Sequence, residues 1–100
     1  MTSKQRAYLR GLANPLEPIV HVGKGGVSDT LFKQADDALT ARELIKGKAL
    51  ETAPETAREA AEAIAVAVDA EVVQVIGRVF VLYRRNNEEP KIVLPKERKQ

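Results

Sequence analysis

A glycine-rich turn between two apolar patterns constrains this chain more than any other feature. Residues 20–28 have the sequence V-H-V-G-K-G-G-V-S, in which a short β-prone run stops at the glycines and a helical pattern begins after them. The backbone of residues 23–26 carries few Cβ atoms and can approach a ligand closely. Backbone N–H groups at the start of the following helix, together with the Lys24 ammonium, attract an anion. We therefore expect a strand, a phosphate-binding loop and a helix, in this order.

The composition indicates one small domain without disulfides or metals. The chain has 100 residues, of which 44% are hydrophobic and 30% are charged, which suffices for one core. It has no cysteine and a single histidine, so neither a disulfide framework nor a common zinc site is expected. The N-terminal residues M-T-S-K-Q-R do not resemble a signal peptide, and no apolar run reaches the roughly 20 residues of a membrane helix. We expect a cytoplasmic monomer with no cofactor, no metal and no membrane partner.

The charges are distributed unevenly along the chain. The formal net charge is only +2, but residues 51–71 contain six acidic residues against one basic residue, whereas both ends of the chain are basic. This segregation favours a polyanion that approaches one side of the fold. From charge alone, chance clustering on a solvated surface is an equally good explanation.

Helical periodicity predicts three helices, which span residues 3–13, 27–41 and 52–69. The third has the clearest start, because Thr52 is a capping residue, Pro54 suits the first turn and Glu55 closes a capping box. Its buried stripe is expected to consist of small and branched side chains: Ala57, Ala60, Ala61, Ile64, Ala65 and Val68. Its outer face is acidic and should point away from any nucleic acid.

Four β-prone runs complete the pattern, at residues 19–22, 44–50, 72–76 and 79–83. Gly77 and Arg78 separate the last two and suit a two-residue hairpin turn. The last run is apolar on both faces, so it needs cover on both sides, and the first helix is the natural cover for the second face.

The predicted order is therefore α-β-α-β-α-β-β. This order indicates an α/β (α+β) fold, a single small domain with a four-stranded mixed sheet and with the second and third helices on one face. We expect the domain to cover residues 1–95, with residues 92–94 as a short strand or a packed tail. Residues 96–100 are expected to be frayed.

Isolated polar residues on these elements carry weaker signals. His21 has no catalytic partner in view, so a packed or hydrogen-bonded structural histidine is favoured over a general base. Lys46 and Lys48 alternate to one side of their strand. Arg6 and Arg10 share a helix face, which by itself favours a solvated surface over a nucleic-acid contact.

The loop can be interpreted as either of two kinds of phosphate-binding site. The sequence K-G-G-V-S is similar to the start of a deviant Walker A loop, K-G-G-x-x-G-K-[S/T], but Asp29 stands where that loop needs glycine and then lysine. A domain of this length also leaves little room for the metal-binding aspartate of a nucleotidase. The alternative is a G-x-x-G loop between strand and helix, with which KH-type modules clamp a nucleic-acid backbone. We favour the second and expect no enzymatic activity.

Four segments together indicate a known family. They are L-x-x-L-A with N-P-L-E-P-I-V within residues 9–20, G-K-G-G-V at 23–27, E-L-I-K-G-K at 43–48 and V-Q-V-I-G-R-V-F-V-L-Y-R at 73–84. In this combination the chain resembles the YhbY-like family, the stand-alone bacterial form of the CRM domain. The resemblance implies a CRM-like RNA-binding domain with an α/β fold similar to the C-terminal domain of a bacterial initiation factor. It also implies association with ribosomal RNA in precursors of the large ribosomal subunit.

The sequence thus predicts a non-enzymatic RNA-binding protein that acts in ribosome assembly. The candidate RNA contacts are glycines and basic side chains of the loop, the first helix and the strands: Gly23, Lys24, Gly25, Gly26, Lys4, Arg6, Arg10, Lys46, Lys48, Arg78 and Arg84. Because Lys24 is the only charge in the loop and few aromatic residues are available for stacking, we expect recognition of backbone and shape rather than base sequence. The alternative is a protein interaction module that docks a ribosomal protein through the apolar sheet edge or the acidic third helix.

Overall fold

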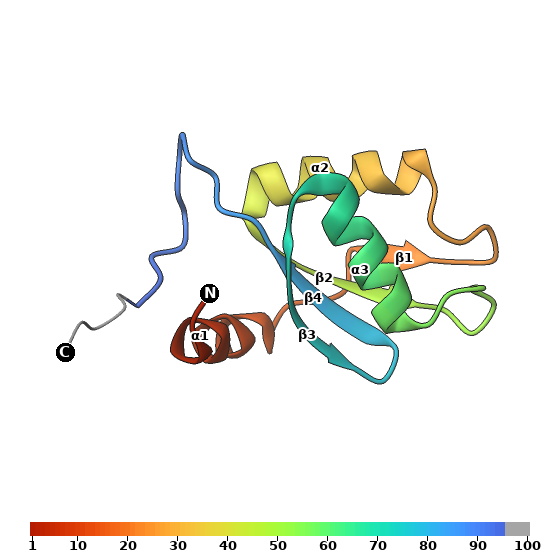
Figure 1. The fold of residues 1–100 in the computed structure, drawn as a ribbon, viewed down its shortest axis with the longest axis horizontal. Helices are drawn as coiled ribbons and strands as arrows, with labels where there is room; N and C mark the ends of the chain where they lie inside the picture. Colours follow the sequence, from red (N-terminus) through yellow and green to blue (C-terminus); the bar gives the residue numbers. More distant parts are fainter. Residues whose placement is uncertain (96–100) are drawn as a thin grey trace.

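The computed structural model describes residues 1–95, and these residues form three helices and four strands in the predicted order (Figure 1). The elements are α1 (Ser3–Ala13), β1 (Val20–Val22), α2 (Asp29–Arg42), β2 (Leu44–Ala49), α3 (Ala57–Val68), β3 (Glu71–Ile76) and β4 (Val79–Tyr83). The predicted α+β class with a four-stranded mixed sheet is confirmed. The predicted frayed tail at residues 96–100 lies outside the described residues.

The sheet has the strand order β1-β2-β4-β3. β1 pairs with β2 in parallel, whereas β4 lies antiparallel between β2 and β3. The chain passes from β1 to β2 through α2 and from β3 to β4 through the turn at Gly77 and Arg78. Gly77 has a φ of 58°, which agrees with the predicted hairpin turn because such turns need a positive φ at their first central residue.

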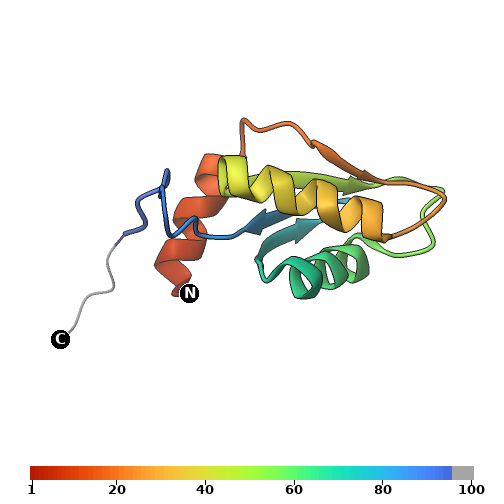
Figure 2. The same cartoon turned by 90° about the horizontal axis from the view of Figure 1, so that it is seen from above.

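Two hydrophobic clusters lie on opposite faces of the sheet. On one face, α2 and α3 cover Phe80 and Leu82 of β4, and the whole predicted stripe of α3 is buried there. On the other face, Leu9 and Ala13 of α1 pack with Val81. The predicted cover of β4 by α1 is therefore confirmed. Seen from above, α1 crosses the strands at one end of the sheet (Figure 2).

The start of α3 was predicted wrongly, because its N-cap lies four residues after Thr52. The N-cap is Thr56, which forms a capping box with Glu59 through bonds of 2.9 and 3.1 Å. The sequence contains the pattern T-x-x-E twice in succession, and the local pattern does not distinguish the two copies. The first copy lies in the turns that follow β2, where its glutamate, Glu55, packs against Gly26 of the glycine loop.

A buried glutamate connects the end of α2 to the segment after β4. Glu43 is the C-cap of α2, has a φ of 65° and is 0% exposed. Its carboxylate accepts hydrogen bonds from the backbone N–H groups of Asn86 (2.7 Å), Lys91 (2.6 Å) and Ile92 (2.7 Å). These bonds hold residues 86–92 in place. Ile92 and Leu94 consequently pack as a tail against the hydrophobic cluster between α1 and the sheet, which we call the α1 cluster. Residues 92–94 form no strand.

The pKa of Glu43 reflects two opposing effects. Burial raises this pKa, but the three backbone N–H donors and the charge of Arg85 lower it, and the net result is a pKa below its ordinary value. The neighbouring Tyr83 has its pKa raised, first by burial and then by the Glu43 carboxylate. Glu43 is therefore a charged group that the native fold stabilises in its ionised form.

Candidate nucleic-acid interface

The glycine loop lies at the end of the molecule away from α1 (Figure 1). The Gly26 N–H donates to the Gly23 carbonyl oxygen at 2.9 Å, and Gly26 has a φ of 70°, a conformation that favours glycine. Lys24 and Gly25 are exposed at the tip, and their backbone N–H groups donate to no acceptor within residues 1–95. The tip thus offers two free backbone donors and one ammonium group to a ligand.

The start of α2 is capped by the protein itself. The Ser28 hydroxyl oxygen accepts from the Leu31 N–H at 3.2 Å, and Asp29 lies in the first turn. The Val27 N–H, which precedes this cap, donates to the Glu55 carboxylate at 3.4 Å. The Leu31 and Val27 N–H groups are therefore not free for an anion, whereas the two donors at the loop tip are.

The register of the strands places a row of side chains across the sheet next to the loop. His21 pairs with Lys48, Lys48 with Val79, and Val79 with Ile76, so the row crosses all four strands in the order of the sheet. His21, Lys48 and Ile76 are exposed, and Val79 is half-buried. Helices α2 and α3 cover the opposite face, and α1 crosses the far end, so this row faces solvent.

A second row lies between the first row and α1. Lys46 of β2 pairs with Val81, and Val81 pairs with Gln74 of β3. Lys46 and Gln74 are half-buried, and Val81 is covered by the α1 cluster. Lys46 and Lys48 therefore share the face that α1 leaves partly open, as their alternation predicted. We call the exposed surface formed by His21, Lys46, Lys48, Val79 and Ile76 the open sheet face.

The predicted basic residues of α1 lie at the far end of this surface. Arg6 donates to the carbonyl oxygens of Val72 at 2.5 Å and Val73 at 3.3 Å, beside the irregularity in the pairing of β3. Lys4 is exposed, and Arg10, one turn after Arg6, is half-buried. Arg6 thus has a structural role that the sequence did not reveal, because it occupies carbonyl groups on the edge strand.

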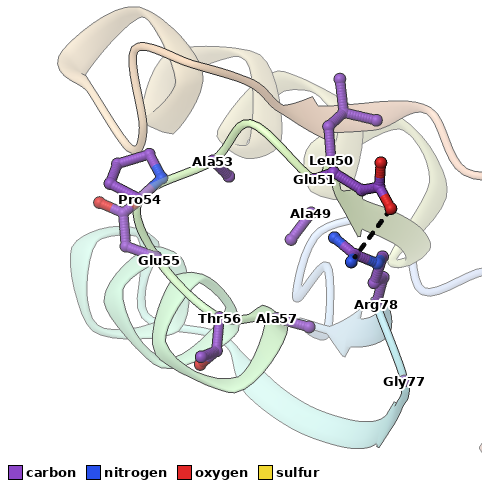
Figure 3. A pocket seen from close by; sticks show the side chains of 10 residues that line it. All are labelled: Ala49, Leu50, Glu51, Ala53, Pro54, Glu55, Thr56, Ala57, Gly77 and Arg78. Carbon is purple, nitrogen blue, oxygen red and sulfur yellow. Dashed lines mark hydrogen bonds and ion pairs between the residues drawn. The ribbon is translucent and has the colours of Figure 1, made fainter.

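Arg78 lies at the turn between β3 and β4, next to the end of β2. Its guanidinium approaches the Glu51 carboxylate at 3.5 Å, and both side chains are largely exposed. The pair lies beside a pocket of about 360 Å³ between the end of β2, the first turn of α3 and this hairpin turn (Figure 3). Since exposed ion pairs contribute little to stability, Arg78 can exchange Glu51 for another anion at small cost.

Arg84 does not belong to this surface. Its guanidinium donates to the Asp36 carboxylate at 2.5 Å, to the Asp36 carbonyl oxygen at 3.0 Å, to the Thr40 hydroxyl at 2.8 Å and to the Val68 carbonyl oxygen at 2.8 Å. These bonds connect the end of β4 to α2 and α3. Arg84 therefore links these elements, and its guanidinium is already occupied by groups of the protein.

The outer faces of α2 and α3 carry the opposite charge. They expose acidic side chains: Asp29, Asp36, Asp37, Glu59 and Glu62. Two of the basic residues there, Lys33 and Arg58, form i,i+4 ion pairs with Asp37 at 3.7 Å and Glu62 at 3.8 Å. Glu59 and Glu62 of the acidic segment thus lie on the opposite side of the sheet from Lys46 and Lys48.

Three members of the open sheet face, His21, Val79 and Ile76, were not predicted as contacts from the sequence. His21 was expected to be packed or hydrogen-bonded, but it is exposed, because Val20 and Val22 on either side point into the core. Strict alternation in V-H-V was the signal for this orientation. Ile76 was treated only as the end of a strand, yet 64% of its surface is exposed.

Within residues 1–95, no three His, Asp or Glu side chains converge in a way that could hold a metal ion. The helices of this part of the chain are also too short or too polar to cross a membrane.

Comparisons with known proteins agree with the family resemblance. The model of the CRS1 / YhbY (CRM) domain matches residues 1–84. The probable RNA-binding protein YqeI of Bacillus subtilis is 44% identical over 95 residues, which cover 95% of this chain and 99% of that protein. An RNA-binding protein of Haemophilus influenzae is 38% identical over 97% of both chains. The solution structure of the hypothetical protein SAV1595 from Staphylococcus aureus superposes with a TM-score of 0.79 at 44% identity, and covers 95% of this chain and 99% of that one.

Proposed function

The chain belongs to the CRS1/YhbY (CRM) domain family, and we propose that it binds RNA through the glycine loop and the open sheet face. The observation that carries this proposal is the strand register, which sets His21, Lys48 and Lys46 on the exposed face beside the loop that holds Lys24. A surface that combines these basic groups with free backbone N–H donors fits a phosphate backbone. The relatives named as RNA-binding proteins support RNA as the ligand.

The open sheet face offers two kinds of contact to RNA. Lys46 and Lys48 lie about 7 Å apart along β2, because residues on one face of a strand repeat every two positions. They and Lys24 can neutralise successive phosphates. At the β3 end of the row, Val79 and Ile76 offer apolar surface, which suits an unpaired base better than a duplex. We therefore propose recognition of phosphates and of unpaired nucleotides in structured RNA.

We propose large-subunit ribosomal RNA precursors as the target, in the cytoplasm. This proposal rests on the family resemblance, which extends from the first helix to Arg84. We propose no catalytic step, because the Walker-like residues K-G-G-V-S end in Ser28 and Asp29 at the start of α2, and neither supplies the phosphate-binding ammonium of a nucleotidase. The role that remains is one of binding and of assisting assembly as a monomer.

A protein-docking role is the alternative, and the structure offers one feature for it. Val66 is 85% exposed on the acidic outer face of α3, on the other side of the sheet from Lys48. A basic ribosomal protein is the partner that this surface would suit. The two roles use different faces, so substitutions on each face distinguish them.

The test measures binding of transcribed large-subunit ribosomal RNA across a range of salt concentrations. Replacing both Lys46 and Lys48 with alanine should weaken binding about tenfold, and should make the slope of log K against log salt shallower by about 1.4 to 1.8. The matched control replaces Lys33 and Arg58 with alanine, which removes the same charge from α2 and α3. Equal effects of the two double variants would contradict a specific open-face site. Crosslinking in cells followed by sequencing of the bound RNA tests the proposed ribosomal target.

A further inference from the structure

The carboxylate of Glu55 lies directly against the glycine loop. A Cβ atom placed on Gly26 would be 2.8 and 2.9 Å from the two carboxylate oxygens of Glu55 and 2.9 Å from Cγ of Pro54. The loop therefore packs against these two residues at the glycine that has a positive φ. Figure 3 shows Pro54 and Glu55 side by side where the chain bends between β2 and α3.

The protein provides few hydrogen bonds to this carboxylate. Its Oε2 accepts one long hydrogen bond of 3.4 Å from the Val27 N–H, and its Oε1 is buried without a hydrogen-bond partner. Within residues 1–95 no Lys or Arg forms an ion pair with Glu55. Oε1 therefore lacks the hydrogen bonds that it would make with water.

The position of this anion coincides with the end of the proposed phosphate-binding loop. The Val27 N–H directly follows Gly26 and is the next backbone donor after those at the loop tip. We propose that Glu55 is a built-in competitor of the RNA phosphate, which occupies the Val27 N–H in the free protein and leaves when phosphate arrives. This inference rests on the proposed function of the loop and adds a control on its affinity.

The exchange needs little rearrangement. Residues 50–55 form turns rather than a regular element, and rotation of the Glu55 side chain toward solvent restores water to both oxygens. Phosphate then gains one more backbone donor, but it must first displace a like charge. The expected consequence is that the native loop binds RNA more weakly than a loop without this carboxylate, which permits release from a finished assembly.

The experiment compares Glu55→Gln with the wild type in the same ribosomal RNA binding assay at physiological salt. Removal of the charge should tighten binding by about three- to tenfold. The matched control is Glu62→Gln, which changes the net charge equally on the outer face of α3 and should change binding less than twofold. Glu55→Ala is measured as a second variant with the same expected direction, since it does not depend on how a glutamine packs against Gly26.

A background variant separates this inference from the proposed function. In a protein with Lys24→Asp and Gly25→Asp, the loop no longer binds phosphate, and the gain from Glu55→Gln should disappear. Unchanged or weaker binding by both folded Glu55 variants overturns the inference and leaves Glu55 as a residue that only positions the loop. If the Lys24 and Gly25 variant itself binds RNA like the wild type, the proposed function of the loop fails instead.

Discussion

Replacing Glu43 with glutamine should destabilise the protein strongly, although the change replaces only one heavy atom. The carboxylate accepts three hydrogen bonds of 2.6–2.7 Å from backbone N–H groups, and it is fully buried. A glutamine with its oxygen at the Oε1 position keeps the bonds from Lys91 and Ile92 as neutral bonds. Its amide group then faces the Asn86 N–H, so that two donors oppose each other.

The expected cost follows from these bonds. Loss of a hydrogen bond to a charged group costs about 1.5–3 kcal/mol, and conversion of two further bonds to neutral ones costs about 0.5–1 kcal/mol each. We therefore expect the free energy of unfolding to fall by about 2.5–5 kcal/mol, which in a domain of this size lowers Tm by roughly 10–40 °C. The protein should still fold, because small domains have about 5–15 kcal/mol of stability.

The pH dependence gives an independent check. The folded-state pKa of Glu43 is lowered, so its stabilising contribution is present above the ordinary pKa of 4.5 and is lost as the pH falls through the folded-state pKa. The stability difference between wild type and Glu43→Gln should therefore be constant near neutral pH and shrink in the acid range. Urea unfolding followed by circular dichroism measures both quantities.

The control for this experiment is Glu89→Gln, an exposed carboxylate of the same segment. It should change stability by no more than about 0.5 kcal/mol. Hydrogen exchange at Asn86 should be slow in the wild type and fast in Glu43→Gln. Exchange at Lys91 and Ile92 should accelerate less, because their bonds persist in neutral form. A Glu43→Gln protein with wild-type stability at pH 7 would refute the role assigned to these three bonds.

Three further predictions concern the interface. The double change Lys24→Asp and Gly25→Asp should weaken ribosomal RNA binding about tenfold or more. It should leave Tm nearly unchanged, because Gly25 has open space around it and no positive φ. RNA titration and thermal unfolding of the same variant measure the two effects. Ile76→Ser should weaken binding of single-stranded RNA about threefold without loss of stability, whereas Val66→Ser on α3 should have no effect in the same titration. Purified protein should not hydrolyse ATP or GTP with Mg²⁺, and turnover that disappears on changing Lys24 would show the non-enzymatic assignment to be wrong.

The layered fold could be predicted because each element carries its own periodic signal. The stripe of α3 repeats at helical spacing, and β4 is apolar on both faces, so the number of layers follows directly. The start of α3 could not be fixed in this way. Thr52 and Thr56 offer the same local pattern, and the choice depends on the contact of Glu55 with Gly26, which are 29 positions apart.

The candidate site could be predicted only in part, for similar reasons. Alternation along β2 predicted that Lys46 and Lys48 share one face of the sheet, and the glycine pattern predicted the loop. Nothing in the chain around Arg84 shows that its partners lie on α2 and at the end of α3. The structural role of Glu43 could not be predicted either, because its partners are backbone N–H groups, which every residue but proline has.

The position of the open sheet face follows from the sizes of the elements. β2 has six residues and is about 20 Å long, whereas α1 crosses the strands and covers a width of only about 10 Å. About half of each central strand therefore remains uncovered on this side. Lysine suits such positions, because its aliphatic stem covers neighbouring apolar groups while its ammonium stays in water. The uncovered half carries Lys48 beside Val79 and adjoins the glycine loop, and the half-buried Lys46 lies at its border with α1. The same lysines therefore solvate the open part of the sheet and supply the positive charge that RNA binding would need.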